Sequence, residues 1–306
     1  MSPNDLPWLW IPLTIWAAFA QTLRNAAQRG LVAKLGTLGA TMVRFLYGLP
    51  FAVAWLAITP AVTNAPLPPV NPTFLAWVVS GGVAQIVATA LLLRVMEERN
   101  FALGVAYTKT ELVLVAVFGA VFLGDVVTPV SALAIGVATA GVLLLSPVDR
   151  QHVLRGFVSG WTSRSALLGV LSGACFAMAA VGYRGAALTL DAPYLVAAAF
   201  TLVWAQAVTV VMLGGWLALR TPAVLVALAR EWRGSLVAGF MGAAASAGWF
   251  TAFTLESAAH VRTLGLVELL FSLAVSRRLF RERLGRFEVA GMVLLTLGLV
   301  IISLGH

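Results

Sequence analysis

Charged residues are scarce in this sequence. Only 10% of the 306 residues are Asp, Glu, Lys or Arg, whereas 60% are hydrophobic, and the mean hydropathy is +0.95. A water-soluble domain of this length carries about 25% charged residues to cover its surface. The shortage excludes a water-soluble globular protein and predicts an integral membrane protein.

Cysteine and histidine are also nearly absent. Cys175 is the one cysteine, so the chain can form no internal disulfide. The three histidines show no metal-ligand spacing, and the sequence has no zinc-protease, nucleotide-binding P-loop or nucleophile-elbow motif. We therefore expect a protein that is not an enzyme and that holds no metal and no cofactor.

The net charge of +8 could suggest a nucleic-acid partner. The basic residues, however, lie in short groups between apolar segments and form no continuous patch with interleaved aromatic residues. The N-terminal residues also lack the positive leader of a secretory signal. We therefore expect no nucleic-acid partner, and we interpret the first apolar run as a membrane span.

Ten segments are long and apolar enough to cross a bilayer as helices, for which about 20 residues each are needed. Their approximate bounds are 8–24, 37–58, 74–95, 101–123, 128–145, 165–190, 194–219, 235–255, 261–280 and 287–304. A transmembrane β-barrel would instead show short segments of alternating polarity. The sequence predicts an all-α integral membrane fold with ten transmembrane helices.

The two halves of the chain repeat one pattern. One shift along the sequence places Glu111 on Glu268, Asp125 on Glu282, Gly141 on Gly298 and Ser146 on Ser303. Five spans per copy is an odd number, so the second copy must enter the membrane from the opposite side. We predict two inverted five-helix repeats, 1–146 and 165–306, joined by a loop at 147–164 and surrounding a central cavity.

Lysine and arginine predict the orientation of the chain. They follow the first, third, fifth and seventh spans and flank the ninth and tenth, whereas the opposite side has only Arg184 and Arg262 near its loops. Loops rich in Lys and Arg remain in the cytoplasm. Both termini are therefore predicted to lie outside the cytoplasm.

Two glutamates lie inside apolar runs, Glu111 in the fourth span and Glu268 in the ninth. A charge at the bilayer centre costs about 2.5–3.5 kcal/mol on insertion scales, so it needs a partner, a cavity or a function. Either both glutamates line a substrate cavity, or they form structural pairs with Arg44 or Lys109. Lys109 is two positions from Glu111, hence on a different face of the helix.

Other polar and aromatic residues lie near the middle of predicted spans and could share one cavity with the glutamates. The full set of predicted substrate-binding residues is Glu111, Glu268, Lys109, Tyr107, Gln85, Gln206, Arg44, Ser272 and Trp249. The alternative for the two glutamines is a hydrogen bond between helices, and for the tryptophan plain packing or a place at the membrane interface. Trp8 and Trp10 are assigned to that interface.

Two short motifs, FLGD at 122–125 and FRE at 280–282, each close the fourth helix of a repeat before a glycine-spaced fifth helix. In this the chain resembles a ten-helix EamA-like member of the drug/metabolite transporter superfamily. The resemblance implies an exporter of metabolites or amino acids in the plasma membrane, the inner membrane of a bacterium. Two features depart from the family: leucine at 112 and 269, where proline is frequent, and the predicted outward termini.

These observations predict a secondary transporter that exports a small polar or amphipathic metabolite, such as an amino acid or an organic cation, by alternating access. Its predicted partners are the small-molecule substrate, the lipid bilayer and protons as a candidate coupling ion. Two alternatives remain open at this point. One is a structural membrane subunit, and the other is a lipid-modifying membrane enzyme with Glu111 as acid or base.

Overall fold

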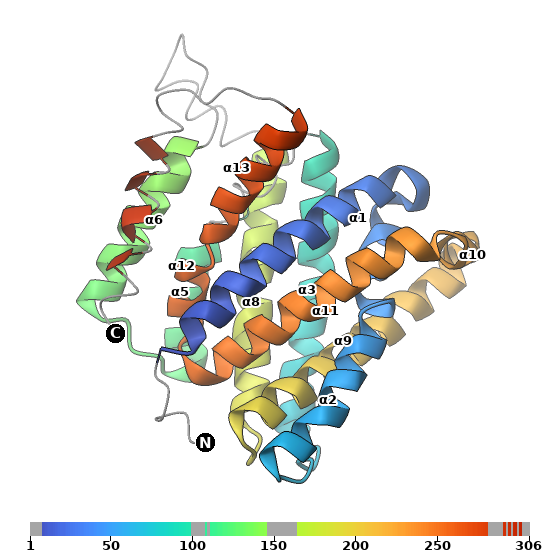
Figure 1. Cartoon of the computed structure of the whole chain (residues 1–306), viewed down its shortest axis with the longest axis horizontal. Coiled ribbons are helices and arrows are strands. Elements are labelled where there is room, and N and C mark those ends of the chain that lie inside the picture. Colours follow the sequence, from blue (N-terminus) through green and yellow to red (C-terminus); the bar gives the residue numbers. More distant parts are fainter. Residues whose placement is uncertain are drawn as a thin grey trace.

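A computed structural model describes residues 8–98, 108, 111–145 and 164–280, and most positions between 290 and 301. This part of the chain is all α-helical and has no β-strand (Figure 1). The helices are α1 (Trp10–Leu46), α2 (Leu49–Thr63), α3 (Pro72–Glu98), α5 (Glu111–Leu123), α6 (Pro129–Leu145), α8 (Arg164–Leu188), α9 (Tyr194–Arg220), α10 (Pro222–Arg230), α11 (Trp232–Leu255), α12 (Ala258–Leu264) and α13 (Val267–Phe280).

Length and composition make the helices suited to a bilayer. Five helical segments of the described chain are long and apolar enough to cross a membrane: the run from Trp10 to Thr63, α3, α8, α9 and α11. Large apolar side chains cover the outside, with Val211 73% and Leu219 86% exposed. Lipid can cover such a surface, and a helix satisfies its own backbone hydrogen bonds there. The predicted class, an all-α membrane protein, is confirmed.

The first helix is longer than the sequence predicted. Its first arm continues past residue 24 to Gly36, which has φ +66° and ψ 171° and turns the chain back. This backbone conformation is open almost only to glycine. The longer helix forms because α1 packs along α11, which buries polar residues such as Asn25 and Gln28 inside the protein. Because Asn25 and Gln28 are polar, the hydropathy pattern predicted that the span ends before them.

Two predicted spans are interrupted. Residues Tyr47 and Gly48 separate α1 from α2 inside the predicted second span, and Gly265 and Leu266 separate α12 from α13 inside the ninth. A further helix, α10, was not predicted and lies between α9 and α11. Breaks of this kind are tolerated at membrane depth only where the backbone is buried in protein or lines a cavity.

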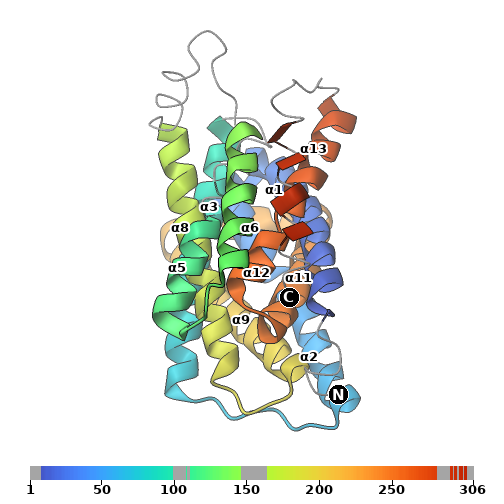
Figure 2. The same ribbon diagram turned by 90° about the vertical axis from the view of Figure 1, so that its left-hand side faces the viewer.

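Contacts between distant segments define two ends of the bundle. At the first end, Asn71 donates a hydrogen bond to the backbone oxygen of Thr189. At the second end, Thr37 bonds Glu97, and Lys34 pairs with Glu231 at 2.8 Å. Between the ends, α1 lies beside α11 and α3 beside α8 (Figures 1 and 2). The middle of α1 therefore faces the interior of the bundle.

Candidate functional site

A small cavity lies between the middle of α1 and the helices α5, α12 and α13. Its volume is about 10 Å³, which is space for about one water molecule. The residues that line it are Gln21, Asn25, Leu92, Thr108, Glu111, Phe176, Arg262 and Glu268. Glu111 is about 18 Å from the end of α5 at Leu123, at 1.5 Å per residue. The two glutamates thus meet deep inside the bundle.

Both carboxylate oxygens of Glu268 accept hydrogen bonds from amides of α1. Gln21 Nε2 donates to Oε2 at 2.9 Å, and Asn25 Nδ2 donates to Oε1 at 3.0 Å. The orientation of each amide is fixed by a second neighbour, because Gln21 Oε1 accepts from Trp249 Nε1 and Asn25 Oδ1 accepts from Arg24. Indole and guanidinium N–H groups can only donate. Glu268 therefore accepts on both oxygens, as an ionised carboxylate does.

Arg262 is the partner of the other glutamate. Its Nη1 lies 3.7 Å from Glu111 Oε1, and its guanidinium lies over the ring of Trp249, 4.7 Å from the centroid. The sequence predicted Arg44 or Lys109 as structural partners and placed Arg262 near a loop. Arg262 does lie close to the turn between α11 and α12, but its side chain is buried, at 8% exposed. It is buried because α12 packs against α5.

The break between α12 and α13 places Arg262 and Glu268 around one cavity. In an unbroken helix, residues six positions apart point about 120° away from each other. The break at Gly265 changes the relative direction of Arg262 and Glu268. The neighbouring residues also leave no room for a side chain at position 265. A Cβ on Gly265 would lie 2.4 Å from Trp249 Cη2. Gly265, Glu268 and Ser272 are all buried.

A pair of arginines from α1 is buried beside this network. Arg24 is 1% exposed and Arg44 is 7% exposed. Arg24 donates from Nε and Nη2 to Asn25 Oδ1, at 3.2 and 2.7 Å. Arg44 Nη1 donates to Thr89 Oγ1 at 3.3 Å. Arg44 forms no ion pair within the described residues, so the expected pairing with Glu111 or Glu268 is not seen there.

The two predicted glutamines do not line the cavity. Gln85 donates to Thr89 Oγ1 at 3.1 Å and so belongs to the surroundings of Arg44. Gln206, on α9, faces the break between α1 and α2, where its Oε1 would lie 3.1 Å from a Cβ on Gly48. Ser272 is fully buried. Tyr107 and Lys109 lie outside the described residues.

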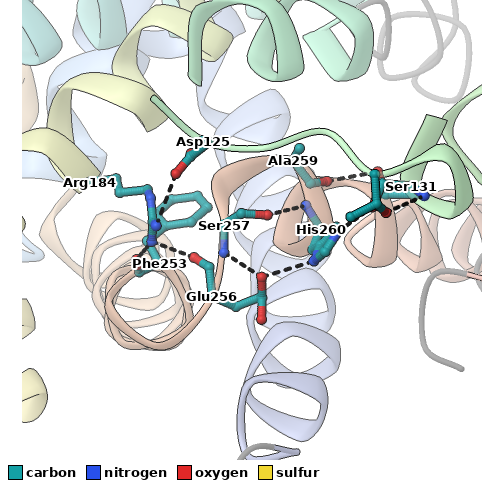
Figure 3. Close-up of polar contacts among 10 residues, drawn as sticks. Asp125, Ser131, Arg184, Phe253, Glu256, Ser257, Ala259 and His260 are labelled. Atoms are coloured by element: carbon teal, nitrogen blue, oxygen red, sulfur yellow. Dashed lines mark hydrogen bonds and ion pairs between the residues drawn. The ribbon is translucent and has the colours of Figure 1, made fainter. Parts of the chain in front are cut away.

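A second polar cluster joins the helices at the first end of the bundle (Figure 3). Arg184 of α8 pairs with Asp125 at 3.2 Å and donates to the backbone oxygens of Phe253 and Glu256 at the end of α11. Cations favour the carbonyl end of a helix for electrostatic reasons. Asp125 thereby ties the loop before α6 to α8 and, through Arg184, to α11.

His260 extends this cluster to α6. Its Nδ1 lies 2.9 Å from Glu256 Oε1, and its Nε2 lies 2.5 Å from Ser131 Oγ (Figure 3). Trp10 stacks on the imidazole, with ring centroids 6.5 Å apart. The predicted place of Trp10 at the membrane interface is therefore wrong, because the ring is 1% exposed, whereas Trp8 is 57% exposed.

Sequence reasoning missed Gln21, Arg24, Asn25 and Arg262. A signal for α1 was present, since Gln21, Asn25 and Gln28 follow the four- and three-residue spacing of one helix face. Arg262 gave no comparable signal, because a basic residue near a predicted helix entrance resembles an ordinary loop residue. Its burial depends on the contact between α12 and α5, which no local pattern encodes.

Comparisons with known proteins bear on the fold and the family. Residues 8–146 match the model of the EamA-like transporter family. A comparison with curated proteins gives no match. Among 26 matching chains of solved structures is a crystal structure of a protein with 15% sequence identity, a TM-score of 0.67 and 96% of each chain covered. At this identity the likeness shows the fold alone.

The proteins of the matched family are transporters rather than enzymes. The match spans the first predicted repeat, whose apolar helices form one half of the described bundle. Together with the five helical segments that can cross a membrane, the match indicates a multi-pass membrane protein whose residues 8–146 are similar to the EamA-like transporter family, which is consistent with the drug/metabolite transporter superfamily.

Proposed function

We propose that this protein is a secondary transporter of the plasma membrane that exports a small polar or amphipathic metabolite by alternating access. One observation carries the proposal. Glu111 and Glu268 occupy matching positions in the two halves of the sequence, and both line one cavity with the buried Arg262. Ionisable groups inside a membrane commonly mark a substrate or ion pathway.

The proposed architecture is ten transmembrane helices in two inverted five-helix repeats, 1–146 and 165–306. Interrupted helices support it, because transporters of this design commonly build their midplane sites from discontinuous helices. The break at Gly265 adjoins the cavity, and the break at Tyr47 and Gly48 lies three residues beyond Arg44. Each half thus contributes one break near buried charges.

The polar cluster at the first end is proposed to hold that end closed. It joins Asp125 and Ser131 of the first half to Arg184, Glu256 and His260 of the second half. Separating the halves at this end would break these contacts together. The cavity between the ends holds about one water, so the solute would enter from a conformation with a wider site.

Proton uptake by Glu268 is the proposed coupling step. A protonated carboxylic acid can accept fewer hydrogen bonds and must donate one. One of the two amides, Gln21 or Asn25, would then lose its acceptor, and α1 would be free to move relative to α13. Protonation would thereby change the contact between the two halves at the site.

The proposed orientation follows from the basic residues. The exposed Arg and Lys side chains near the second end include Lys34, Arg94, Arg230 and Arg233. By the positive-inside tendency this end faces the cytoplasm. The solute would then leave through the first end, where the Asp125 and His260 contacts form the closure.

Reconstitution tests the proposal. Purified protein in liposomes should exchange a labelled solute across the membrane, in a screen of amino acids, organic cations and sugars. Glu111→Gln and Glu268→Gln should lower this exchange, whereas Glu231→Gln at the second end should leave it unchanged. Conversion of lipid without exchange would instead support a lipid-modifying enzyme. Absence of both would favour a structural subunit.

A further inference from the structure

Arg24 and Arg44 come from the two arms of α1, which fold back on each other at Gly36. Their side chains meet against Gly242 of α11. A Cβ on Gly242 would lie 3.2 Å from Arg44 Cγ and 3.4 Å from Arg24 Cδ. Both side chains thus pack against the same glycine in the interior of the bundle.

Neither guanidinium forms an ion pair within the described residues. Arg24 binds the neutral oxygen of Asn25, and its Nη1 is buried with no hydrogen-bond partner in that part of the chain. Arg44 binds the neutral hydroxyl of Thr89. Glu268, the nearby carboxylate, accepts from Gln21 and Asn25 instead. Within the described residues, the printed hydrogen bonds of both guanidinium groups therefore go to neutral oxygens.

The charges buried in the interior of the described bundle also do not balance. Among the described residues, the buried charged side chains are Arg24, Arg44, Arg262, Glu111 and Glu268, three positive and two negative. An uncompensated charge in a low-dielectric interior costs several kcal/mol. Such an excess persists where a ligand supplies the missing charge, as intramembrane ionisable residues in transport pathways do.

We propose that Arg24 and Arg44 form the binding site for a carboxylate group of the transported solute. The inference rests on the proposed transport function and narrows its substrate class to carboxylate-bearing solutes, such as amino acids, and away from purely cationic ones. A planar guanidinium offers parallel N–H groups that match the two oxygens of a carboxylate. The free Nη1 of Arg24 is the donor that such a group would take.

The site connects to the cavity through Asn25. This side chain lines the cavity, accepts from Arg24 and donates to Glu268. A solute carboxylate that accepts from both Nη1 and Nη2 of Arg24 would compete with Asn25 Oδ1 for Nη2. Its arrival would therefore free the amide that holds Glu268. An ammonium group on the same solute would find Glu111 and Glu268 on the opposite side of this amide.

Matched solutes test the inference. Liposomes containing the full-length protein are loaded with an equimolar mixture of four classes of solute. The first class is amino acids with small, aliphatic and aromatic side chains. The others are the carboxamides, the 2-hydroxy acids and the amines that correspond to these amino acids. Efflux of each is measured by mass spectrometry against protein-free liposomes. An amino acid and its amide have nearly the same shape, but only the acid has a negative charge.

We expect the carboxylate-bearing solutes to leave at least about tenfold faster than their amides, the effect of one charge-assisted hydrogen bond. Arg24→Gln and Arg44→Gln should each remove that preference, and Arg230→Gln, at the exposed second end, should retain it. Amides or amines that leave as fast as the acids would overturn the inference while leaving transport intact. If no solute of any class leaves, the proposed transport function fails first.

A second variant at position 24 is included in case Arg24→Gln does not fold. Arg24→Lys keeps the charge but loses the planar pair of donors, so it should fold and show a reduced preference for acids over amides. An unchanged preference in folded Arg24→Lys and folded Arg24→Gln would also overturn the assignment. Elution as a single species in detergent establishes folding. If the variants do not fold, the comparison of acids with amides in the unaltered protein decides.

Discussion

Replacing Glu268 by glutamine tests the central contact of the candidate site. The carboxylate accepts hydrogen bonds from both Gln21 and Asn25, whose orientations are fixed by Trp249 and Arg24. A glutamine at 268 has one oxygen and one NH₂ group. One of the two amides of α1 would then face a donor instead of an acceptor and could not turn over without losing its other partner.

The size of the effect follows from these contacts. A hydrogen bond to a charged group contributes about 1.5–3 kcal/mol, and a buried donor left without an acceptor adds about 1–3 kcal/mol. The substitution also removes one of two buried negative charges beside three buried arginines. We expect a loss of about 2 kcal/mol or more, equivalent to a Tm lowered by about 4–8 °C.

The measurement is the loss of monodisperse protein in detergent after heating, followed by tryptophan fluorescence during size-exclusion chromatography. Glu231→Gln is the matched control, because Glu231 forms an exposed pair with Lys34 at the second end. Exposed pairs contribute about 0–1 kcal/mol. The control should therefore change Tm by no more than about 2–4 °C.

One result would refute this reasoning. If Glu268→Gln and Glu231→Gln both melt with the unaltered protein, Glu268 does not accept from two amides as a carboxylate. The proposed coupling step, which depends on these two contacts, could not then begin at Glu268. A lowered Tm with unchanged transport would keep the structural contact and remove Glu268 from the transport cycle.

Three further predictions follow from single contacts. Gly36→Ala should lower stability by roughly 1–3 kcal/mol, because φ +66° with ψ 171° strains any side chain; Gly30→Ala, in open space without positive φ, should not, and both are measured by thermal melting. Trp249→Phe removes the indole N–H that holds the amide of α1 and should slow transport severalfold with little loss of folded protein; unchanged rates would contradict the role of this contact. Ser131→Ala removes a hydrogen bond to His260 and weakens the closure at the first end. In a cysteine-free background with cysteine in place of Leu92, this variant should react faster with an impermeant maleimide added on the side of the first end than the same protein with Ser131. Equal reaction rates would exclude a gate at that end.

The membrane class followed from composition, because a chain with so few charged residues cannot cover its surface with them in any fold. The burial of Glu111 and Glu268 also followed from the sequence, since each carboxylate lies inside an apolar run and the two occupy matching positions in the two halves of the sequence. Ser272, one helical turn from Glu268, was placed in the same predicted span and is buried with it. These are local or periodic properties.

Helix boundaries were less well determined. The first arm of α1 continues through Arg24 and Gln28, which are buried by packing against α11 rather than exposed at the end of a span. The break at Gly265 lies within an uninterrupted apolar pattern. Hydropathy averages over a window of residues, so it detects neither a polar helix face turned inward nor a single-residue break.

The sequence by itself determined that this chain crosses a membrane as helices and that two of its glutamates need an interior environment. Only the tertiary structure decided which residues meet them: Arg262 beside Glu111, and two amides of α1 on Glu268. Gln21 and Glu268 are 247 positions apart in the chain. Hydropathy and periodicity act over one helix, whereas partners from distant helices are selected by packing, so only the assembled bundle specifies them.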